Sequence, residues 1–99
     1  MSELLKPEGS NGVVIWKFTI GPGEEPIRMP EGSRILAVGQ QQGDVVVWAA
    51  CDPHALPEWR HLTIEGTGGG FGRAARIYHG TVQMPNGLVW HVVEAVVHA

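Results

Sequence analysis

The residues best suited to chemistry form a glycine-rich stretch followed closely by two arginines. Residues 66–72 read GTGGGFG, and Arg73 and Arg76 come next. Exposed backbone N–H groups and guanidinium groups both bind phosphate oxygens, so the stretch is a candidate contact for an anion or a nucleotide. The predicted ligand-binding residues are Gly68, Gly69, Gly70, Arg73 and Arg76.

The same stretch also fits a connector between two strands. It lacks the Gly-Lys-Ser/Thr sequence of a Walker loop, and no helix-forming segment follows it, as a dinucleotide fingerprint would require. Glycine-rich segments are flexible linkers by default. The sequence therefore leaves both interpretations open.

Metal and catalytic signatures do not emerge from the remaining polar residues. Cys51 and His54 have the spacing of half a zinc site, but no second pair matches them. His61 and His79 fall at positions typical of half-exposed strand residues. The carboxylates are scattered through turns, and no serine lies in an elbow motif. We therefore predict no metal site, no cofactor and no enzyme activity.

The elements that must position these residues are short β-type runs between Gly/Pro turns. No window has a helical period, and apolar residues alternate along several runs. The pattern predicts an all-β fold, a small antiparallel sandwich or open barrel of about six to seven strands built from hairpins. The expected strands are residues 13–20, 27–29, 34–42, 44–51, 59–65, 76–84 and 88–97.

Two predicted turns and one terminal segment indicate how the chain is divided. Gly43 lies in a tight turn between two runs, and Asn86-Gly87 is the strongest hairpin signal in the chain. Residues 1–12 are polar and rich in Pro, Gly and Ser, which predicts a flexible arm. We expect residues 13–99 to form a single β domain.

Tryptophans divide between the predicted core and a predicted interface. Trp16, Trp48 and Trp90 lie inside strands, where we expect them to fill the core. Trp59 lies at a loop edge beside Arg60 and could be either a core residue or an exposed anchor, since Trp and Arg dominate interface hot spots.

The last strand is apolar on both faces, which suggests that a second copy covers it. Self-association is the simplest explanation in so short a chain. The predicted interface residues are Trp59, Arg60, Val89, His91 and Val93.

Composition narrows the classes of partner. A formal charge of −3 opposes nucleic acid as a partner. The single cysteine, Cys51, excludes an intramolecular disulfide and suits a reducing compartment. Neither a signal-peptide pattern nor a membrane-spanning apolar run of about 20 residues is found. We expect a cytoplasmic protein without a membrane partner.

Six short motifs carry a resemblance over about Val13 to Glu94. In this order they resemble a family of small uncharacterised proteins encoded by bacteriophages and prophages. The chain departs from that family in its longer N-terminal segment, in the glycines after Gly68 and in the tail beyond Glu94. The motifs are Ile15-Trp16-Lys17-Phe18, Met29-Pro30-Glu31-Gly32, Trp48-Ala49 with Asp52-Pro53, Gly66-Thr67-Gly68, Gly80-Thr81-Val82-Gln83 and Leu88-Val89-Trp90-His91.

The resemblance implies a phage origin and a compact β domain, and it carries over no catalytic residues. With the glycine-rich stretch and the apolar last strand, it leads us to expect a homo-oligomeric, non-enzymatic binding protein in the host cell cytoplasm. Such a protein would antagonise a host process, by sequestering a small anionic, nucleotide-type signal or by masking a host defence protein. The alternative is a virion component, such as a decoration or connector subunit.

Overall fold

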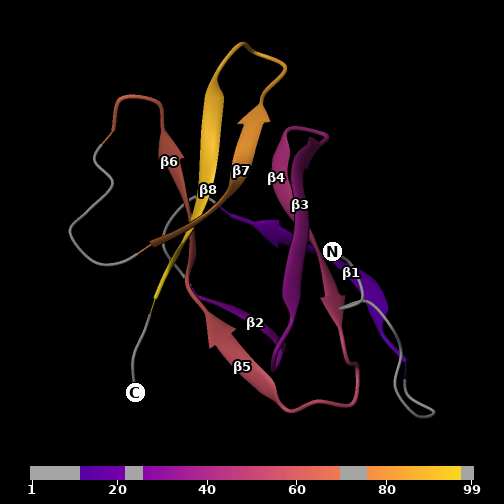
Figure 1. Cartoon of the computed structure of the whole chain (residues 1–99). Coiled ribbons are helices and arrows are strands. Elements are labelled where there is room, and N and C mark those ends of the chain that lie inside the picture. Colours follow the sequence, from indigo (N-terminus) through magenta and orange to yellow (C-terminus); the bar gives the residue numbers. More distant parts are fainter. Residues whose placement is uncertain (1–11, 22–25, 70–75, 97–99) are drawn as a thin grey trace.

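The computed structural model describes residues 12–21, 26–69 and 76–96. Its strands are β1 (Val14–Ile20), β2 (Ile27–Pro30), β3 (Arg34–Gln41), β4 (Asp44–Cys51), β5 (Pro57–Arg60), β6 (Leu62–Gly66), β7 (Arg76–Gln83) and β8 (Val89–Ala95). They form three antiparallel sheets, with the orders β1-β4-β3, β2-β5 and β6-β8-β7, and these sheets do not close into a barrel (Figure 1). The predicted all-β, antiparallel fold is confirmed. No helix of the described residues could cross a membrane.

Two predicted hairpins organise the larger sheets. β3 and β4 are joined by Gln42 and Gly43, whose φ angles of 54° and 87° both lie in the left-handed region, as a type I′ turn requires. β7 and β8 are joined through Asn86 and Gly87, and the Asn86 side chain accepts a hydrogen bond from the Leu88 N–H at 3.0 Å. The two turns predicted from Gly43 and from Asn86-Gly87 are therefore confirmed.

The hydrophobic core lies between the two three-stranded sheets. β3 of one sheet packs beside β7 of the other, and the β2-β5 ribbon covers one end (Figure 1). Burial of β-branched and other aliphatic side chains from six strands supplies the main stabilisation. The buried core residues are Ile20, Met29, Val45, Val47, Leu62, Val82 and Val92.

The described residues form eight strands, where about six to seven were expected. The predicted single strand over residues 59–65 is divided at His61, because β5 pairs with β2 whereas β6 pairs with β8. At the division the His61 carbonyl accepts a hydrogen bond from the Ala95 N–H at 3.0 Å. The predicted arm lies outside the described residues, apart from Gly12.

Trp16 is not a core residue, which corrects one prediction. Its side chain is 42% exposed, whereas Trp90 packs against the core. β1 is an edge strand, so its apolar alternation extends beyond the part of the face that the second sheet covers. Trp48 is half-buried and lies against Gly39.

β8 is the central strand of its sheet, and it has buried residues on both faces. Val92 belongs to the core, and Val93 on the opposite face is also fully buried, with 0% of its surface exposed. The apolar pattern of this strand is therefore explained without a second copy. Val93 was a predicted interface residue, but it is not exposed at the surface.

Candidate functional site

A polar face lies on the side of the β6-β8-β7 sheet that points away from the core. The register aligns Glu65, His91 and Thr81 across the three strands, and a neighbouring row aligns Thr63, Val93 and Tyr78. Directly paired residues share a face of a sheet, so these six side chains lie together. We call this surface the outer face.

A β-bulge at His79 creates this arrangement on β7. The register shifts between Tyr78 and Gly80, so one extra residue is inserted opposite β8. In a regular strand Tyr78 and Thr81 would point to opposite faces, but the bulge places both on the outer face. His79 points to the other side, where its ring bonds Glu94. Simple alternation places His79 with Ile77 and Thr81; His79 and Ile77 do lie on the side of Glu94, but the bulge places Thr81 on the outer face.

His91 is the centre of a hydrogen-bonded cluster on the outer face. Its Nε2 lies 2.7 Å from Thr67 Oγ1, and its Nδ1 lies 2.8 Å from the Tyr78 hydroxyl and 3.3 Å from Thr81 Oγ1. The Tyr78 and Thr81 hydroxyls are also bonded to each other. Because hydroxyls both donate and accept, either tautomer of the ring can be satisfied. We call these four residues the His91 cluster.

Three of the six motifs meet in the His91 cluster. Thr67 comes from Gly66-Thr67-Gly68, Thr81 from the Gly80-Thr81 motif, and His91 from the last motif. Their spacing in the sequence gave no indication that they touch. Tyr78 was not singled out in the sequence, and only the bulge explains its place in the cluster.

Arg76 lines a small pocket next to the cluster. The pocket has a volume of about 170 Å³ and is lined by Arg76 from β7, Ala95 from β8, and His61, Thr63 and Glu65 on the β6 side. Thr63 donates a hydrogen bond to Glu65 at 3.2 Å. The pocket therefore combines a guanidinium, an imidazole, a hydroxyl and a carboxylate. We call it the Arg76 pocket.

The predicted ligand-binding residues are placed only in part. Gly68 and Gly69 follow Thr67 in the turn after β6, and the Gly69 N–H donates to the Gly66 carbonyl at 3.0 Å. That N–H is therefore used within the turn. Gly70 and Arg73 lie outside the described residues.

The predicted interface residues do not form one surface. Trp59 is 59% exposed, and the Arg28 guanidinium lies 5.3 Å from the centre of its ring. Arg60, its neighbour, points instead into a buried polar network. Val89 and His91 are half-buried on β8. Trp59 is thus at the surface, whereas Arg60 has an internal partner.

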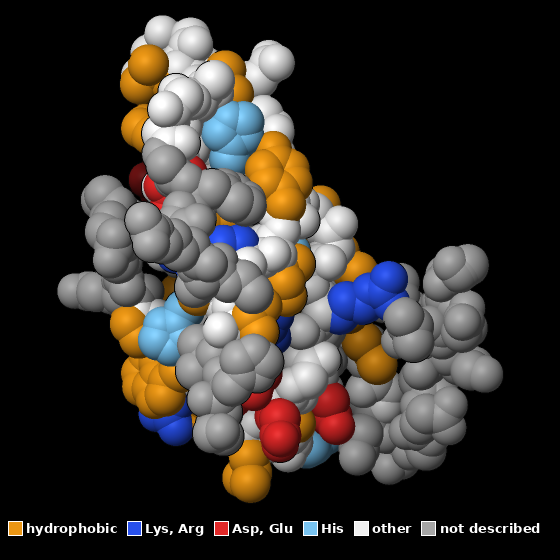
Figure 2. Space-filling view, turned by 60° about the vertical axis from the view of Figure 1, so that its left-hand side comes forward, with side chains coloured by type: hydrophobic (Ala, Val, Ile, Leu, Met, Phe, Trp, Pro, Cys, Tyr) orange, Lys and Arg blue, Asp and Glu red, His pale blue; other side chains and the backbone are white. Residues whose placement is uncertain are grey.

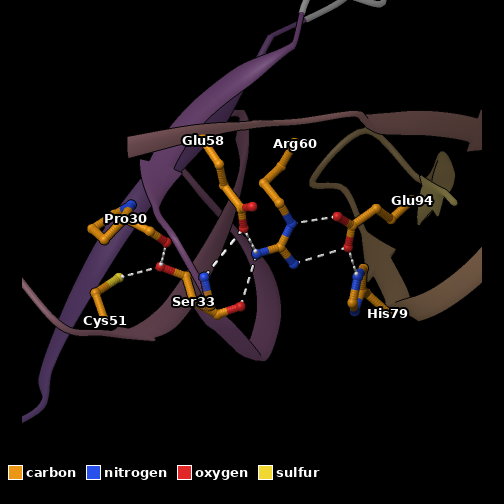
Figure 3. A network of polar contacts seen from close by, with 8 residues as sticks. Pro30, Ser33, Cys51, Glu58, Arg60, His79 and Glu94 are labelled. Atoms are coloured by element: carbon orange, nitrogen blue, oxygen red, sulfur yellow. Dashed lines mark hydrogen bonds and ion pairs between the residues drawn. The ribbon is translucent and has the colours of Figure 1, made fainter. Parts of the chain in front are cut away.

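The polar network of Arg60 joins the β2-β5 ribbon to the β6-β8-β7 sheet (Figure 3). Arg60 donates through Nε and Nη2 to the two carboxylate oxygens of Glu94, and through Nη1 to the Ser33 carbonyl at 2.8 Å. The His79 ring bonds the same carboxylate at 2.8 Å. The fork of Arg60 on Glu94 is a bidentate pair, the strongest geometry for such a contact. We call Arg60, Glu94 and His79 the Arg60 network.

The pairing in the Arg60 network sets the charge states of Arg60 and Glu94. Burial by itself would raise the pKa of Glu94, but the hydrogen bonds and positive charges of Arg60 and His79 outweigh it, so its pKa lies below the ordinary value. The hydrogen bond to Glu94 raises the pKa of Arg60 against the opposing effect of burial. Both groups therefore stay charged over the neutral pH range, as a structural tether requires.

Cys51 is a buried free thiol beside Ser33. The Ser33 hydroxyl donates to the Pro30 carbonyl at 2.6 Å and lies 3.2 Å from the Cys51 sulfur (Figure 3). Within the described residues, no group of three or more His, Cys, Asp or Glu side chains is arranged to hold a metal ion.

Comparison with known proteins gives one match. The family model described as a domain of unknown function, DUF7352, matches residues 12–99. No curated protein and no solved structure matches significantly. The matched range includes every strand of the structure as well as the outer face. The chain therefore belongs to the DUF7352 family.

Proposed function

We propose that this chain is a non-enzymatic binding protein that captures a small phosphorylated, nucleotide-type ligand on the outer face. The observation that carries the proposal is the position of the Arg76 pocket beside the His91 cluster, where the glycine-rich stretch begins. Basic, imidazole and hydroxyl groups are thereby gathered on one sheet face from residues far apart in the sequence.

The Arg76 pocket and Tyr78 on the outer face are suited to different parts of the ligand. A pocket of about 170 Å³ accommodates a phosphate group but not a whole nucleotide. Arg76 and His61 supply cationic or donor groups for phosphate oxygens, and Glu65 accepts from a ligand hydroxyl or amino group. Tyr78 is 51% exposed and offers a ring on which a base can stack.

The His91 cluster is assigned to binding rather than to catalysis. Thr67 and His91 have the spacing of a nucleophile and a base. However, the groups at the other ring nitrogen are the hydroxyls of Tyr78 and Thr81, and no carboxylate of the described residues is bonded there to stabilise an imidazolium. Hydroxyls and an imidazole ring instead suit hydrogen bonding to the polar edges of a bound molecule.

The resemblance to phage and prophage proteins supplies the biological setting of the proposal. A phage protein that removes a nucleotide signal from the host cytoplasm would antagonise a host process without catalysis. Masking of a host defence protein by the same face is the variant that applies if no small ligand binds.

Isothermal titration with nucleoside monophosphates and cyclic dinucleotides tests the proposal. We expect at least one of them to bind, and we expect Arg76→Ala to weaken that binding by about tenfold to a hundredfold, because one charge-assisted contact contributes roughly 1.5–3 kcal/mol. Arg34→Ala is the matched control, because Arg34 lies on β3, outside this sheet. Absence of binding by every nucleotide, or equal affinity in Arg76→Ala, would contradict the proposal.

A structural subunit of a phage particle is the second candidate, and β1 favours it. This strand is the edge of its sheet, and Ile15 is 61% exposed on it. Exposed apolar edge strands pair readily with other chains. Self-association through β1 is also how we expect the binding protein to form a homo-oligomer.

Size-exclusion chromatography with light scattering tests the β1 contact. We expect the wild type to be oligomeric and Ile15→Lys to be monomeric, because a lysine at an edge strand blocks pairing. Leu36→Lys is the control, since it places the same charge on an exposed residue of β3. A monomeric wild type would contradict self-association through β1, both for the binding protein and for the structural subunit. Detection of the chain in purified particles would favour the structural subunit.

A further inference from the structure

A second candidate binding surface is a groove between β1 and the β2-β5 ribbon. It has a volume of about 300 Å³. Its walls include Trp16 and Phe18 from β1, Arg28 and Pro30 from β2, Pro53 from the loop between β4 and β5, and Pro57 from β5. It is distinct from the outer face, which belongs to the β6-β8-β7 sheet. We call it the Trp16 groove.

The ribbon register explains why this wall is aromatic, apolar and basic. Arg28 pairs with Trp59, and Pro30 pairs with Pro57, so these four side chains share one face of the ribbon. Arg28 and Trp59 are both exposed there, with the guanidinium 5.3 Å from the ring centre. Figure 2 shows that hydrophobic side chains on the side of the molecule it presents form separate patches interrupted by charged and polar groups. The composition of the groove, Trp with Arg, is that of a binding hot spot.

The walls of the groove are held in place without a ligand. The Glu31 N–H donates to the Leu56 carbonyl at 2.7 Å, which ties the end of β2 to the start of β5. In the loop between β4 and β5, the N–H groups of His54 and Ala55 donate to Asp52 at 2.9 and 3.0 Å. Prolines fix the backbone further. A preformed wall reduces the entropy cost of binding.

We infer that the Trp16 groove binds an extended, proline-containing acidic peptide segment of a partner protein. Proline-rich segments are already extended in solution, and they dock into aromatic-lined grooves at little entropy cost. Arg28 is the one charged side chain that lines the groove in the described part of the chain, so the complementary residue of the peptide is a carboxylate. Trp59 and the strongly exposed Leu56 extend the contact beyond the groove.

Fluorescence anisotropy with two labelled peptides tests the inference. One peptide repeats two prolines and a glutamate, and the other has lysine in place of each glutamate. We expect the acidic peptide to bind the wild type, and we expect Arg28→Glu to weaken it by about tenfold or more while improving the lysine peptide, because like charges at an interface repel. Trp16→Ala should also weaken the acidic peptide.

Two controls separate this surface from the outer face and from misfolding. Arg76→Ala should leave the peptide affinity unchanged, because Arg76 lies on the other sheet. Circular dichroism should show that Arg28→Glu keeps the fold, since Arg28 is exposed. Equal binding of both peptides, no binding of either, or no effect of Arg28→Glu would each overturn the inference.

Discussion

Replacement of Glu94 by alanine is expected to destabilise the fold by about 3 kcal/mol, because it leaves the buried guanidinium of Arg60 uncompensated. Arg60 would lose both contacts of its bidentate pair, and His79 would lose its partner. The side chains of Arg60 and Glu94 are only 15% and 8% exposed, so water cannot replace the lost contacts freely. Urea unfolding at neutral pH measures the loss. A change below about 0.5 kcal/mol, typical of surface sites, would contradict the tether.

The same contact predicts how stability depends on pH. Because the pKa of Glu94 is lower in the folded chain, its charge stabilises the fold above the unfolded value, which is about 4.3 for a glutamate. That stabilisation is lost as the pH falls through the lower folded value. We expect unfolding free energies measured in an acid series to fall less steeply in Glu94→Gln than in the wild type. Identical slopes would show that Glu94 is not the responsible group.

Gly80→Ala is expected to destabilise the fold by roughly 3 kcal/mol, through combined backbone strain and overpacking. Gly80 has a φ of 156°, which side chains rarely adopt, and an added Cβ would lie 2.6 Å from the Val38 Cγ2 atom. Val38 is on β3, where the two larger sheets meet, so neither backbone can move away freely. Thermal unfolding followed by circular dichroism provides the measurement.

Two further variants separate the steric part from the backbone part. Val38→Ala in combination with Gly80→Ala removes the close contact, so it should recover part of the lost stability while the strain at Gly80 remains. Gly21→Ala is the matched control, since no atom lies within 4 Å of its added Cβ. If Gly80→Ala were as stable as Gly21→Ala, the close packing of β3 on β7 would be wrong.

Local signals predicted the hairpins, because turn chemistry is decided by a few adjacent residues. Gly43 and Asn86-Gly87 each specify a turn whose backbone only such residues adopt easily. The boundary at His61 could not be predicted in the same way. Residues 59–65 read as one continuous strand in the sequence, and only the different partners of β5 and β6 divide them.

The candidate site could be predicted only in part, because a bulge and long-range pairing assemble it. Arg76 was identified from its position after a glycine-rich stretch. The grouping of Tyr78 with Thr81, however, depends on the extra residue at His79, which shifts the strand by one position. The importance of Glu94 was missed for a related reason, since a lone carboxylate in an apolar strand gives no indication of its partner Arg60.

The outer face is the central element of this account, and backbone amide NMR during a nucleotide titration tests it most directly. We predict that the amides of Thr67, Arg76 and His91 shift together and saturate at one affinity, while amides of the Trp16 groove stay in place. Shifts confined to other surfaces, or no saturable shift with any nucleotide, would contradict a phosphate-binding role for the outer face.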